Sequence, residues 1–433
     1  MAAVTVYRAR VLLNPTPQRR VECLWDGALV VDASNGSIVA CAPTAELGRH
    51  FSGAPTVDFG PHSVLLPGLV DVHTHLPQYP AIGQDRDELL TWLRELIFPL
   101  EARYADPDFA EQQAELFFRT ALDSGTTTLV TFGPPTAAAT SRAFAAAARA
   151  GLRVLMGQTL MDRNVPVELS TPTNDALQAL ERITAEWHGD DGRLFSVVSP
   201  RFAGSCSLEL LQLCSRFAQR HQLLLQTHLA ESPRELRWIA ELFPEFSDYT
   251  AIYEAAALLT PRTIFAHCIY LSPSERARLH SAGCAIAHCP RSNAFLRSGI
   301  MPLRQYLQEG LRVGLGTDIG AGYSLSVLEE ARYACEMAKL RAFLTPEEVP
   351  TEVTPEEALW LATLGGAQAL GLEHQIGTLD PGKEADFIVL DTSAWVPAAT
   401  LQGLAPEALV SRLLYTAPPS SLKAVFVRGR RLR

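Results

Sequence analysis

The sequence predicts an α/β protein in which a TIM-like (β/α)8 barrel carries a small β-sandwich domain built from both chain termini. Two observations lead to this fold class. From residue 64 onward, short apolar runs rich in β-branched residues alternate with alanine- and leucine-rich segments of helical periodicity. Eight such runs over about 300 residues are typical of a barrel, whereas an open doubly wound sheet usually has a glycine-rich phosphate loop after its first strand. This chain lacks that loop.

The predicted barrel strands follow one another between residues 63 and 320. Segments such as SRAFAAAARAG and SLELLQLCSRFAQRH separate them, and their apolar residues recur at the spacing of one helix face. The eight runs are SVLLPGLVDVHTH (63–75), GTTTLVTFG (125–133), LRVLMGQTL (152–160), LFSVVSPRF (194–202), QLLLQTHLA (222–230), TIFAHCIYL (263–271), CAIAHCPRSN (284–293) and RVGLGTDIG (312–320).

The sequence also predicts short strands near both ends of the chain, outside the repeating pattern of the barrel. These strands cover residues 4–13, 28–43, 385–391 and 422–433. Asn35-Gly36 within the second segment suits a tight hairpin turn. We therefore expect residues 1–63 and 376–433 to form the β-sandwich domain together, and residues 64–375 to form the barrel.

Composition narrows the functional class. The chain has 433 residues, 47% of them hydrophobic and 19% charged, as in an ordinary globular protein. Its formal charge of −10 argues against a general surface for nucleic acid or anionic membranes. The first residues show no signal peptide, and no apolar run approaches the roughly 20 residues of a membrane span. Eight cysteines without a CxxC pair indicate free thiols, so we expect a cytoplasmic protein.

Polar residues follow several predicted strands at the point where each strand ends. His73 and His75 share one face of the first strand, because successive side chains of a strand alternate. His228, His267 and Asp318 end later strands, and the carboxyl ends of barrel strands meet at one mouth. His-x-His alone is weak evidence, since a single buried histidine is usually satisfied within the core. One divalent cation satisfies several imidazoles and a carboxylate together, and this donor set suits zinc, with iron or cobalt as alternatives.

Lysine usage favours one metal ion over two. Binuclear sites on such barrels commonly need a bridging ligand from a middle strand, often a modified lysine. Lys339, Lys383 and Lys423 are the only lysines of the chain, and none of them falls in a predicted barrel strand. The sequence therefore predicts a mononuclear site.

Glu231 lies three residues after His228, in THLAE. One interpretation is a solvated glutamate at the start of the next helix, where negative charge is favourable. The other is a proton shuttle whose carboxylate reaches a substrate above the metal. Its place beside His228 favours the shuttle.

Several motifs resemble the amidohydrolase superfamily, specifically its cytosine/adenosine deaminase-like branch, and the resemblance covers essentially the whole chain. They are PGLVDVHTH, QTHLAE, AHC, HCPRSN, GLGTDIGAG and IGTLDPGKEADFIVLD. Within that branch a second set resembles the guanine deaminase family: HTHLPQYP, LLTWLRELIFPLEARY, GTTTLVTFG, MDRNVP, SPRF, THLAE and GTDIGAGYS. His-x-His is shared by most of the superfamily, whereas the combination is specific.

The resemblance implies a role for each matching residue, and no matching position departs from the family pattern. One zinc ion per chain, with Fe2+ as an alternative, would be held by His73, His75, His228 and Asp318. The catalytic residues would be Glu231 as the proton shuttle, Asp318 as the acceptor of the nucleophile's proton, and His267 as a hydrogen-bond partner of the hydroxide. Substrate contacts would come from Gln78, Arg201, Phe202, His228 and Glu231. The resemblance also implies a homodimer.

The implied reaction is hydrolytic deamination of guanine, a small-molecule substrate, to xanthine and ammonia. The arginine fork of Arg201 matches the O6 and N7 acceptors of guanine, whereas adenine would present a donor at the position of O6. Phe202 would pack against the purine ring. Read without the resemblance, Arg201 and Phe202 are a surface arginine and a core phenylalanine. Trp92 and Phe98 either help to cover the pocket or form the apolar face of an amphipathic helix.

Three alternatives compete with this interpretation. The same site could act on another heterocycle, such as 8-oxoguanine, a pterin or a triazine. The cytidine-type zinc deaminase design needs His-x-Glu with a downstream Pro-Cys-x-x-Cys, and the sequence has neither. A non-catalytic assembly protein on the same barrel would be expected to lose metal ligands, whereas all the expected ligands and the shuttle are present.

Overall fold

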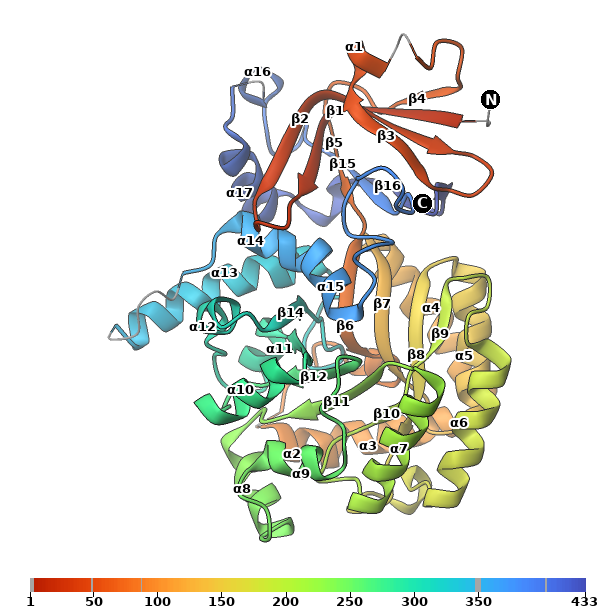
Figure 1. Ribbon diagram of the computed structural model, residues 1–433, viewed down its shortest axis with the longest axis vertical. Coiled ribbons are helices and arrows are strands. Elements are labelled where there is room, and N and C mark those ends of the chain that lie inside the picture. Colours follow the sequence, from red (N-terminus) through yellow and green to blue (C-terminus); the bar gives the residue numbers. More distant parts are fainter. Residues whose placement is uncertain (1–3, 48–49, 87, 347–351, 402) are drawn as a thin grey trace.

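Eight parallel strands form a nearly closed barrel in the larger part of the molecule (Figure 1). The structure is a computed structural model that describes residues 4–433 apart from 48–49, 87, 347–351 and 402. The fourth strand is broken in two, and both pieces pair with β8. The barrel strands are β6 (Leu69–His75), β7 (Thr126–Gly133), β8 (Arg153–Leu160), β9 (Leu194–Ser196) with β10 (Ser199–Pro200), β11 (Leu225–Leu229), β12 (Thr263–His267), β13 (Ala285–His288) and β14 (Arg312–Leu315). The predicted barrel is confirmed.

Hydrogen bonds at two places close the ring of strands. A parallel bridge between Val198 and Leu225 joins the half that begins with β6 to the half that begins with β11. At the other seam, the backbone N–H of Asp318 donates to the carbonyl of His73 over 2.9 Å. The N–H of His75 donates to the carbonyl of Ile319, also over 2.9 Å. The first and last strands are therefore held together just beyond β14.

Helices cover the outside of the barrel, and their start signals are visible in the sequence. Ser232 and Ser272 each form a capping box with a glutamate three residues later, and Ser207 caps the helix that follows it. The helices between β7 and β14 are α5 (Ala137–Ala150), α6 (Thr173–Trp187), α7 (Leu208–His221), α8 (Pro233–Leu242), α9 (Tyr249–Ala255), α10 (Pro273–Ser281), α11 (Pro290–Phe295) and α12 (Leu303–Gln308). After β14 come α13 (Val327–Leu344), α14 (Pro355–Trp360), a π-turn (Leu361–Gly365) and α15 (Gly366–Leu370). None of the helices in the described part of the chain has the length and apolarity needed to cross a membrane.

A long connection between β6 and the next barrel helix lies at the end of the barrel remote from the terminal sheet (Figure 1). It begins with the 3-10 helix η1 (Leu76–Ala81) directly after His75. A continuous helical stretch follows, made of α2 (Leu89–Trp92), a π-turn (Leu93–Ile97), α3 (Phe98–Ala102) and a 3-10 turn (Arg103–Ala105), and leads to α4 (Pro107–Asp123). This connection places Gln78 and Trp92 at the mouth of the barrel.

The two chain ends meet in a separate mixed sheet at the top of Figure 1. Its strand order is β17-β16-β15-β5-β1-β2-β3, with β4 paired to β1. Its strands are β1 (Val4–Pro15), β2 (Val21–Asp32), β3 (Ile38–Pro43), β4 (Thr56–Asp58), β5 (Ser63–Pro67), β15 (Phe387–Asp391), β16 (Leu422–Val427) and β17 (Arg430–Arg431). The short helices α1 (Thr44–Leu47) and α16 (Ala398–Leu401), helix α17 (Pro406–Thr416) and the turn Pro419–Ser421 lie in the same terminal segments. The prediction that both termini build one small β domain is confirmed, and the strands of this domain belong to one mixed sheet.

The prediction of one barrel strand over residues 63–75 is wrong, because this run forms two strands in two different sheets. β5 pairs antiparallel with β15 in the terminal sheet, and β6 starts the barrel. Gly68 sits between them, where an added Cβ would lie 2.1 Å from the Thr127 hydroxyl. The chain thus crosses from sheet to barrel at a residue that must be glycine. The domain boundaries at residues 63 and 375 stay a proposal.

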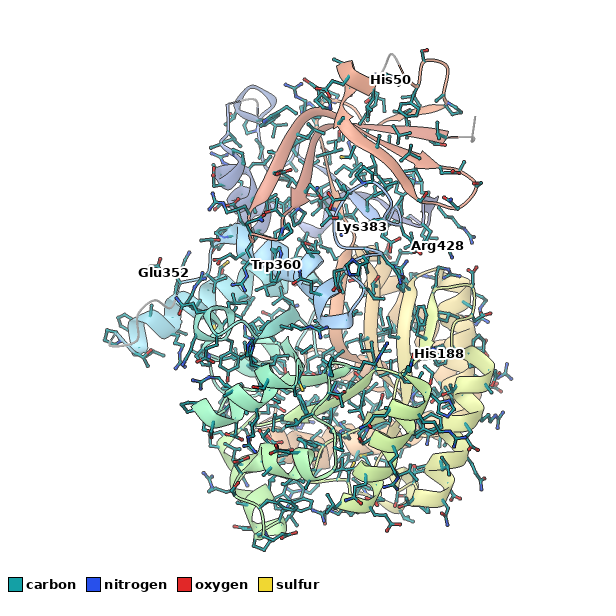
Figure 2. All side chains as sticks on the ribbon, viewed as in Figure 1. His50, His188, Glu352, Trp360, Lys383 and Arg428 are labelled. Carbon is teal, nitrogen blue, oxygen red and sulfur yellow. The ribbon has the colours of Figure 1, made fainter. Side chains whose placement is uncertain are left out.

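A buried ion-pair network fastens the terminal sheet to the barrel. The guanidinium of Arg153, at the start of β8, is fully buried and pairs with both Asp386 and Glu384. Arg428, which lies at the junction in Figure 2, donates from its backbone N–H to Asp386 over 2.8 Å and from its side chain to the Asp191 carbonyl over 2.7 Å. Breaking a buried pair by removing one partner typically costs about 3–5 kcal/mol. The terminal sheet and the barrel are therefore joined by buried ion pairs as well as by the covalent chain.

Candidate active site

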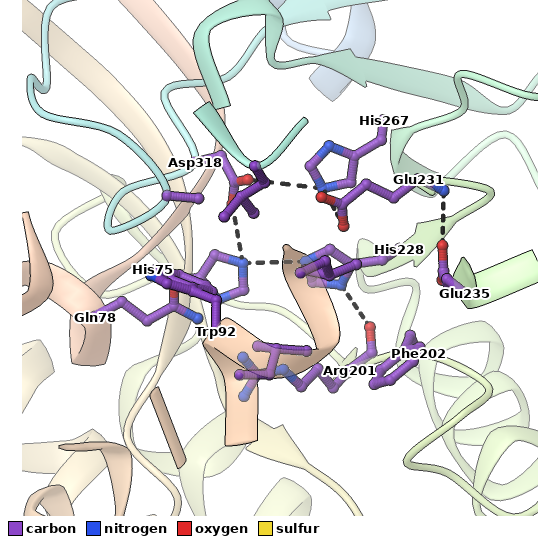
Figure 3. Close-up of a pocket in the computed structure, with 14 residues that line it drawn as sticks. His75, Gln78, Trp92, Arg201, Phe202, His228, Glu231, Glu235, His267 and Asp318 are labelled. Atoms are coloured by element: carbon purple, nitrogen blue, oxygen red, sulfur yellow. Dashed lines mark hydrogen bonds and ion pairs between the residues drawn. The ribbon is translucent and has the colours of Figure 1, made fainter. Parts of the chain in front are cut away.

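Three histidines and one aspartate from the ends of three barrel strands meet at the mouth of the barrel. Figure 3 shows His75, His228 and Asp318 of this group. His73 and His75 come from β6, His228 from β11, and Asp318 from the turn after β14. One potential ligand atom of each residue lies within 4.8 Å of the others. The Nε2 atoms of His73 and His75 lie 3.2 and 3.3 Å from Asp318 Oδ1, and those of His75 and His228 are 3.1 Å apart. All four side chains are buried.

The chemistry of this group fits a divalent metal ion. Both ring nitrogens of His73 are buried. Nδ1 has no hydrogen-bond partner among the described residues, and Nε2 lies 3.2 Å from the Asp318 carboxylate, where a cation between them would bind both groups. Burial lowers the pKa of His75 to about 3 and the pKa of His228 well below its ordinary value, so both imidazoles are neutral. His228 Nδ1 donates to the Arg201 carbonyl over 2.6 Å, which leaves its Nε2 lone pair free to bind a metal.

The carboxylate of Asp318 is ionised and held in place. Although burial raises its pKa, the hydrogen bonds from His73 and His75 bring the pKa well below the ordinary aspartate value. Ser292, on α11, donates its hydroxyl to Asp318 Oδ2 over 2.6 Å. The motif HCPRSN therefore contributes to this site through its serine, a contact that spacing along the chain does not reveal.

His267 lies beside the four-residue group and is not a member of it. Its Nε2 is 3.7 Å from Asp318 Oδ2 and 3.4 Å from Glu231 Oε2. Its Nδ1 donates a hydrogen bond to the side-chain oxygen of Asn293 over 2.9 Å. This hydrogen bond places the ring between the two carboxylates, in keeping with a role apart from metal binding.

Glu231 projects into the same cavity and is fully enclosed by protein. Burial, reinforced by the negative charge of Asp318, raises the pKa of Glu231 to about 8. The hydroxyl of Ser298 donates to Glu231 Oε1 over 2.9 Å, which leaves Oε2 directed toward His267. The carboxyl group is therefore protonated near neutral pH, contrary to a solvated glutamate at a helix start.

A cavity of about 400 Å³ opens above the metal group. Gln78, Arg201 and Phe202 line it, as the sequence predicts, together with His75, His228, Glu231, His267 and Asp318. Trp92 also lines it, with apolar neighbours Leu89, Leu93, Leu296 and Ala321. Phe98 instead lies under the guanidinium of Arg201, 5.4 Å from its carbon to the ring centroid. The two aromatic residues thus have different places, one at the cavity wall and one behind Arg201.

Two buried carboxyl groups near the cavity are not singled out by the sequence. Glu235 accepts from the backbone N–H of Glu231 over 2.8 Å and from the Tyr249 hydroxyl over 2.9 Å. The capping box of α8 explains its position. Glu101, on α3, pairs with Arg201 and accepts from Gln78. Only helical periodicity is visible around Glu101 in the sequence, since its partners lie 23 and 100 residues away.

Comparison with known proteins finds relatives that match most of the chain. The model of the amidohydrolase family matches residues 64–432. The probable guanine deaminase of Deinococcus radiodurans is 37% identical over 405 residues, covering 92% of this chain and 90% of that protein. The guanine deaminase of Escherichia coli is 35% identical over 332 residues, covering 76% and 74%. The crystal structure of a C. acetobutylicum guanine deaminase with guanine in its active site superposes with a TM-score of 0.92 at 26% identity, covering 99% of each chain.

Proposed function

This chain belongs to the amidohydrolase family, and we propose that it is a guanine deaminase, which hydrolyses guanine to xanthine and ammonia. The observation that carries the proposal is one cavity lined by members of the candidate metal group, by a buried glutamate whose pKa is raised, and by a buried arginine. A neutral purine with an acceptor edge and an amino group fits these three features together. Neither a binding protein nor a structural protein needs all three.

We propose zinc as the metal, held by the three imidazoles and the carboxylate described above. Nitrogen-rich sites with one carboxylate suit zinc better than Mg2+ or Ca2+, which prefer oxygen ligands. When bound, such an ion lowers the pKa of a water molecule toward about 7, so that a nucleophile is available at neutral pH.

The side chains around the metal group would move the protons. Asp318 has one oxygen toward the histidines and the other toward Ser292 and His267, so it can accept the proton of the attacking water. Glu231 carries a proton that it can deliver to N3 of guanine as the water oxygen adds to C2. The proton that Asp318 accepted would then pass to the 2-amino group as the carbon–nitrogen bond breaks, so that ammonia leaves. The remaining hydroxyl proton would return to Glu231 as the carbonyl of xanthine forms. His267 would orient the water between the two carboxyl groups.

Base recognition would come from Arg201, Gln78 and Phe202. Arg201 is only 2% exposed, so a ring that offers its guanidinium N–H groups no acceptor binds poorly. Guanine offers O6 and N7 as acceptors, the edge that arginine reads in other contexts. Phe202, buried and packed against Trp238 at a ring-centroid distance of 5.8 Å, supplies an apolar wall.

Incubation of the metal-analysed protein with guanine tests this proposal. The absorption spectrum is expected to change to that of xanthine, with one ammonia released for each xanthine formed. 8-Oxoguanine, a pterin and an amino-triazine serve as comparison substrates and are expected to be turned over more slowly. Protein with a full complement of zinc that leaves guanine unchanged, or prefers another ring, would contradict the assignment. We also propose, from the family resemblance, a cytoplasmic homodimer.

The pH dependence of turnover should report on Glu231. Its pKa is raised to about 8, and the protonated form is the one that can donate to the ring. We therefore expect kcat/KM for guanine to be level around pH 7 and to fall above about pH 8, as Glu231 loses its proton. The measurement is kcat/KM from pH 6 to pH 10 at constant ionic strength.

Ser298→Ala provides the control for this profile. The Ser298 hydroxyl lowers the pKa of Glu231, so its removal should move the alkaline fall to higher pH. Titration of the substrate itself is common to both proteins and cancels in the comparison. If kcat/KM falls at the same pH in the variant as in the wild type, the fall reports the titration of a group other than Glu231.

A further inference from the structure

The carboxylate of Glu101 connects the two polar side chains that line the recognition end of the cavity. Glu101 lies on α3, and its side chain is 5% exposed. Its Oε1 accepts a hydrogen bond from Gln78 Nε2 over 3.0 Å. Its Oε2 forms an ion pair with Arg201 Nη1, whose side chain is 3% exposed. One buried group thus holds two residues that lie 123 positions apart along the chain.

The first consequence is a fixed orientation of the Gln78 amide. A carboxylate can only accept hydrogen bonds, so the nitrogen of the amide must face Glu101. The oxygen of the amide then faces the backbone N–H of Gly320, which donates to it over 3.2 Å. Both ends of the amide are therefore assigned. One N–H and one lone pair remain for a ligand.

The second consequence concerns the guanidinium of Arg201. Glu101 pairs with Nη1 of the guanidinium. Phe98, one turn earlier on the same helix as Glu101, packs against the flat face of the guanidinium. The Arg201 carbonyl is held by the Thr227 hydroxyl over 3.1 Å and by His228 Nδ1 over 2.6 Å. Side chain and backbone are both fixed, so the N–H groups not bound to Glu101 are presented in one direction.

The third consequence is electrostatic. A buried guanidinium without a partner would attract any anion of suitable size, such as a carboxylate or a phosphate. Paired with Glu101, it keeps its N–H donors while the net charge of the pair is zero. Such a surface favours a neutral ring with acceptor atoms over an anionic ligand.

We propose that Glu101 is a positioning residue that sets base specificity, because it orients Arg201 and Gln78 toward the acceptor edge of the purine and neutralises the arginine. The inference rests on the proposed function, which it deepens by naming the residue that selects for a 6-oxo purine. Glu101 does not line the cavity, so it acts through its two partners.

Binding of two unreactive purines tests this proposal without relying on turnover. Hypoxanthine has the O6 and N7 acceptors of guanine, purine lacks O6, and neither has a 2-amino group. Calorimetry on the zinc-loaded protein should give a Kd for hypoxanthine about 30-fold lower than that for purine, because unpaired buried donors penalise the ring that lacks O6. In Glu101→Gln the Kd for purine divided by the Kd for hypoxanthine should fall to about 3 or less. The neutral amide at position 101 holds Arg201 and Gln78 less firmly, so both side chains can reorient.

Two further variants make the outcome decisive. Glu95→Gln changes an exposed glutamate of the same helical stretch, whose carboxylate pairs with Arg94 at the surface, and should leave the ratio unchanged. Glu101→Asp keeps the charge but shortens the reach, so an intermediate ratio is expected. A wild-type ratio in Glu101→Gln, or equal weakening for both purines, would overturn the proposal, as would loss of the folded state in both Glu101 variants. Failure of the wild-type protein to deaminate guanine, with an intact hypoxanthine preference, would instead count against the proposed function alone.

Discussion

Replacing Glu231 with glutamine is expected to lower kcat/KM for guanine by about 10³-fold while the metal content stays unchanged. Glutamine keeps the size of the side chain and can still accept from Ser298, but it has no acidic proton to deliver to the ring. The four residues of the metal group are untouched, so metal binding should persist. Steady-state kinetics and metal analysis of the same preparation provide the measurement.

The control for this variant is Glu241→Gln, at an exposed position of α8, the helix that begins just after Glu231. It removes one negative charge from the same region and should leave kcat/KM within about twofold, as for most surface substitutions. Turnover close to wild type in Glu231→Gln would remove Glu231 from the shuttle role. Loss of metal together with activity would show that its effect is structural.

Removal of the metal is expected to abolish deamination, with a loss of about 10⁴-fold or more, and to destabilise the fold. Without a cation the buried Nε2 atoms of His73, His75 and His228 are left crowded against one another and against Asp318. Since the metal binds the folded site and not the unfolded chain, its binding free energy adds to stability, and the melting temperature should drop by about 5 °C or more on chelation. Activity, metal content and thermal unfolding are measured on the chelated protein.

Readdition of metals distinguishes the proposed ion from others. Zinc should restore both activity and melting temperature, whereas Mg2+ should restore neither, because it prefers oxygen ligands in octahedral geometry. Full turnover by protein that metal analysis shows to be free of transition metals would refute the metal-dependent mechanism. Restoration by Fe2+ to a higher level than by zinc would change the identity of the metal and leave the site intact.

Much of the fold was predictable because the barrel repeats one local pattern. Each apolar run ends in a polar residue or turn, and the capping serines mark the next helix, so strands such as β7 and β8 lie within a residue of their predicted bounds. The break at Gly68 was not predictable in this way. An uninterrupted apolar run looks the same whether it belongs to one sheet or to two, and its partners in β1 and β15 lie far away in the sequence.

The site residues also divide into those that a local sequence pattern reveals and those that only contacts between distant segments reveal. His73 and His75 could be found from alternation within one strand, and His228, His267 and Asp318 from their places at the ends of other strands. Glu101 could not, because its importance depends on contacts with Gln78 and Arg201 that exist only after the helix has packed across the mouth. Ser292 is similar, since a serine two residues into a short helix shows no sign of the carboxylate that it holds.

The backbone seam at His73 and His75 has a consequence for how the protein is made. These two ligands emerge early in synthesis, but the residues that close the ring against them, Asp318 and Ile319, emerge about 240 residues later. No shorter nascent chain contains all four metal ligands. If these residues hold the proposed metal, we expect its capture to be a late event, when the last strand of the barrel pairs with the first. Three of the residues proposed to hold the metal with their side chains, His73, His75 and Asp318, therefore also close the barrel with their backbone groups.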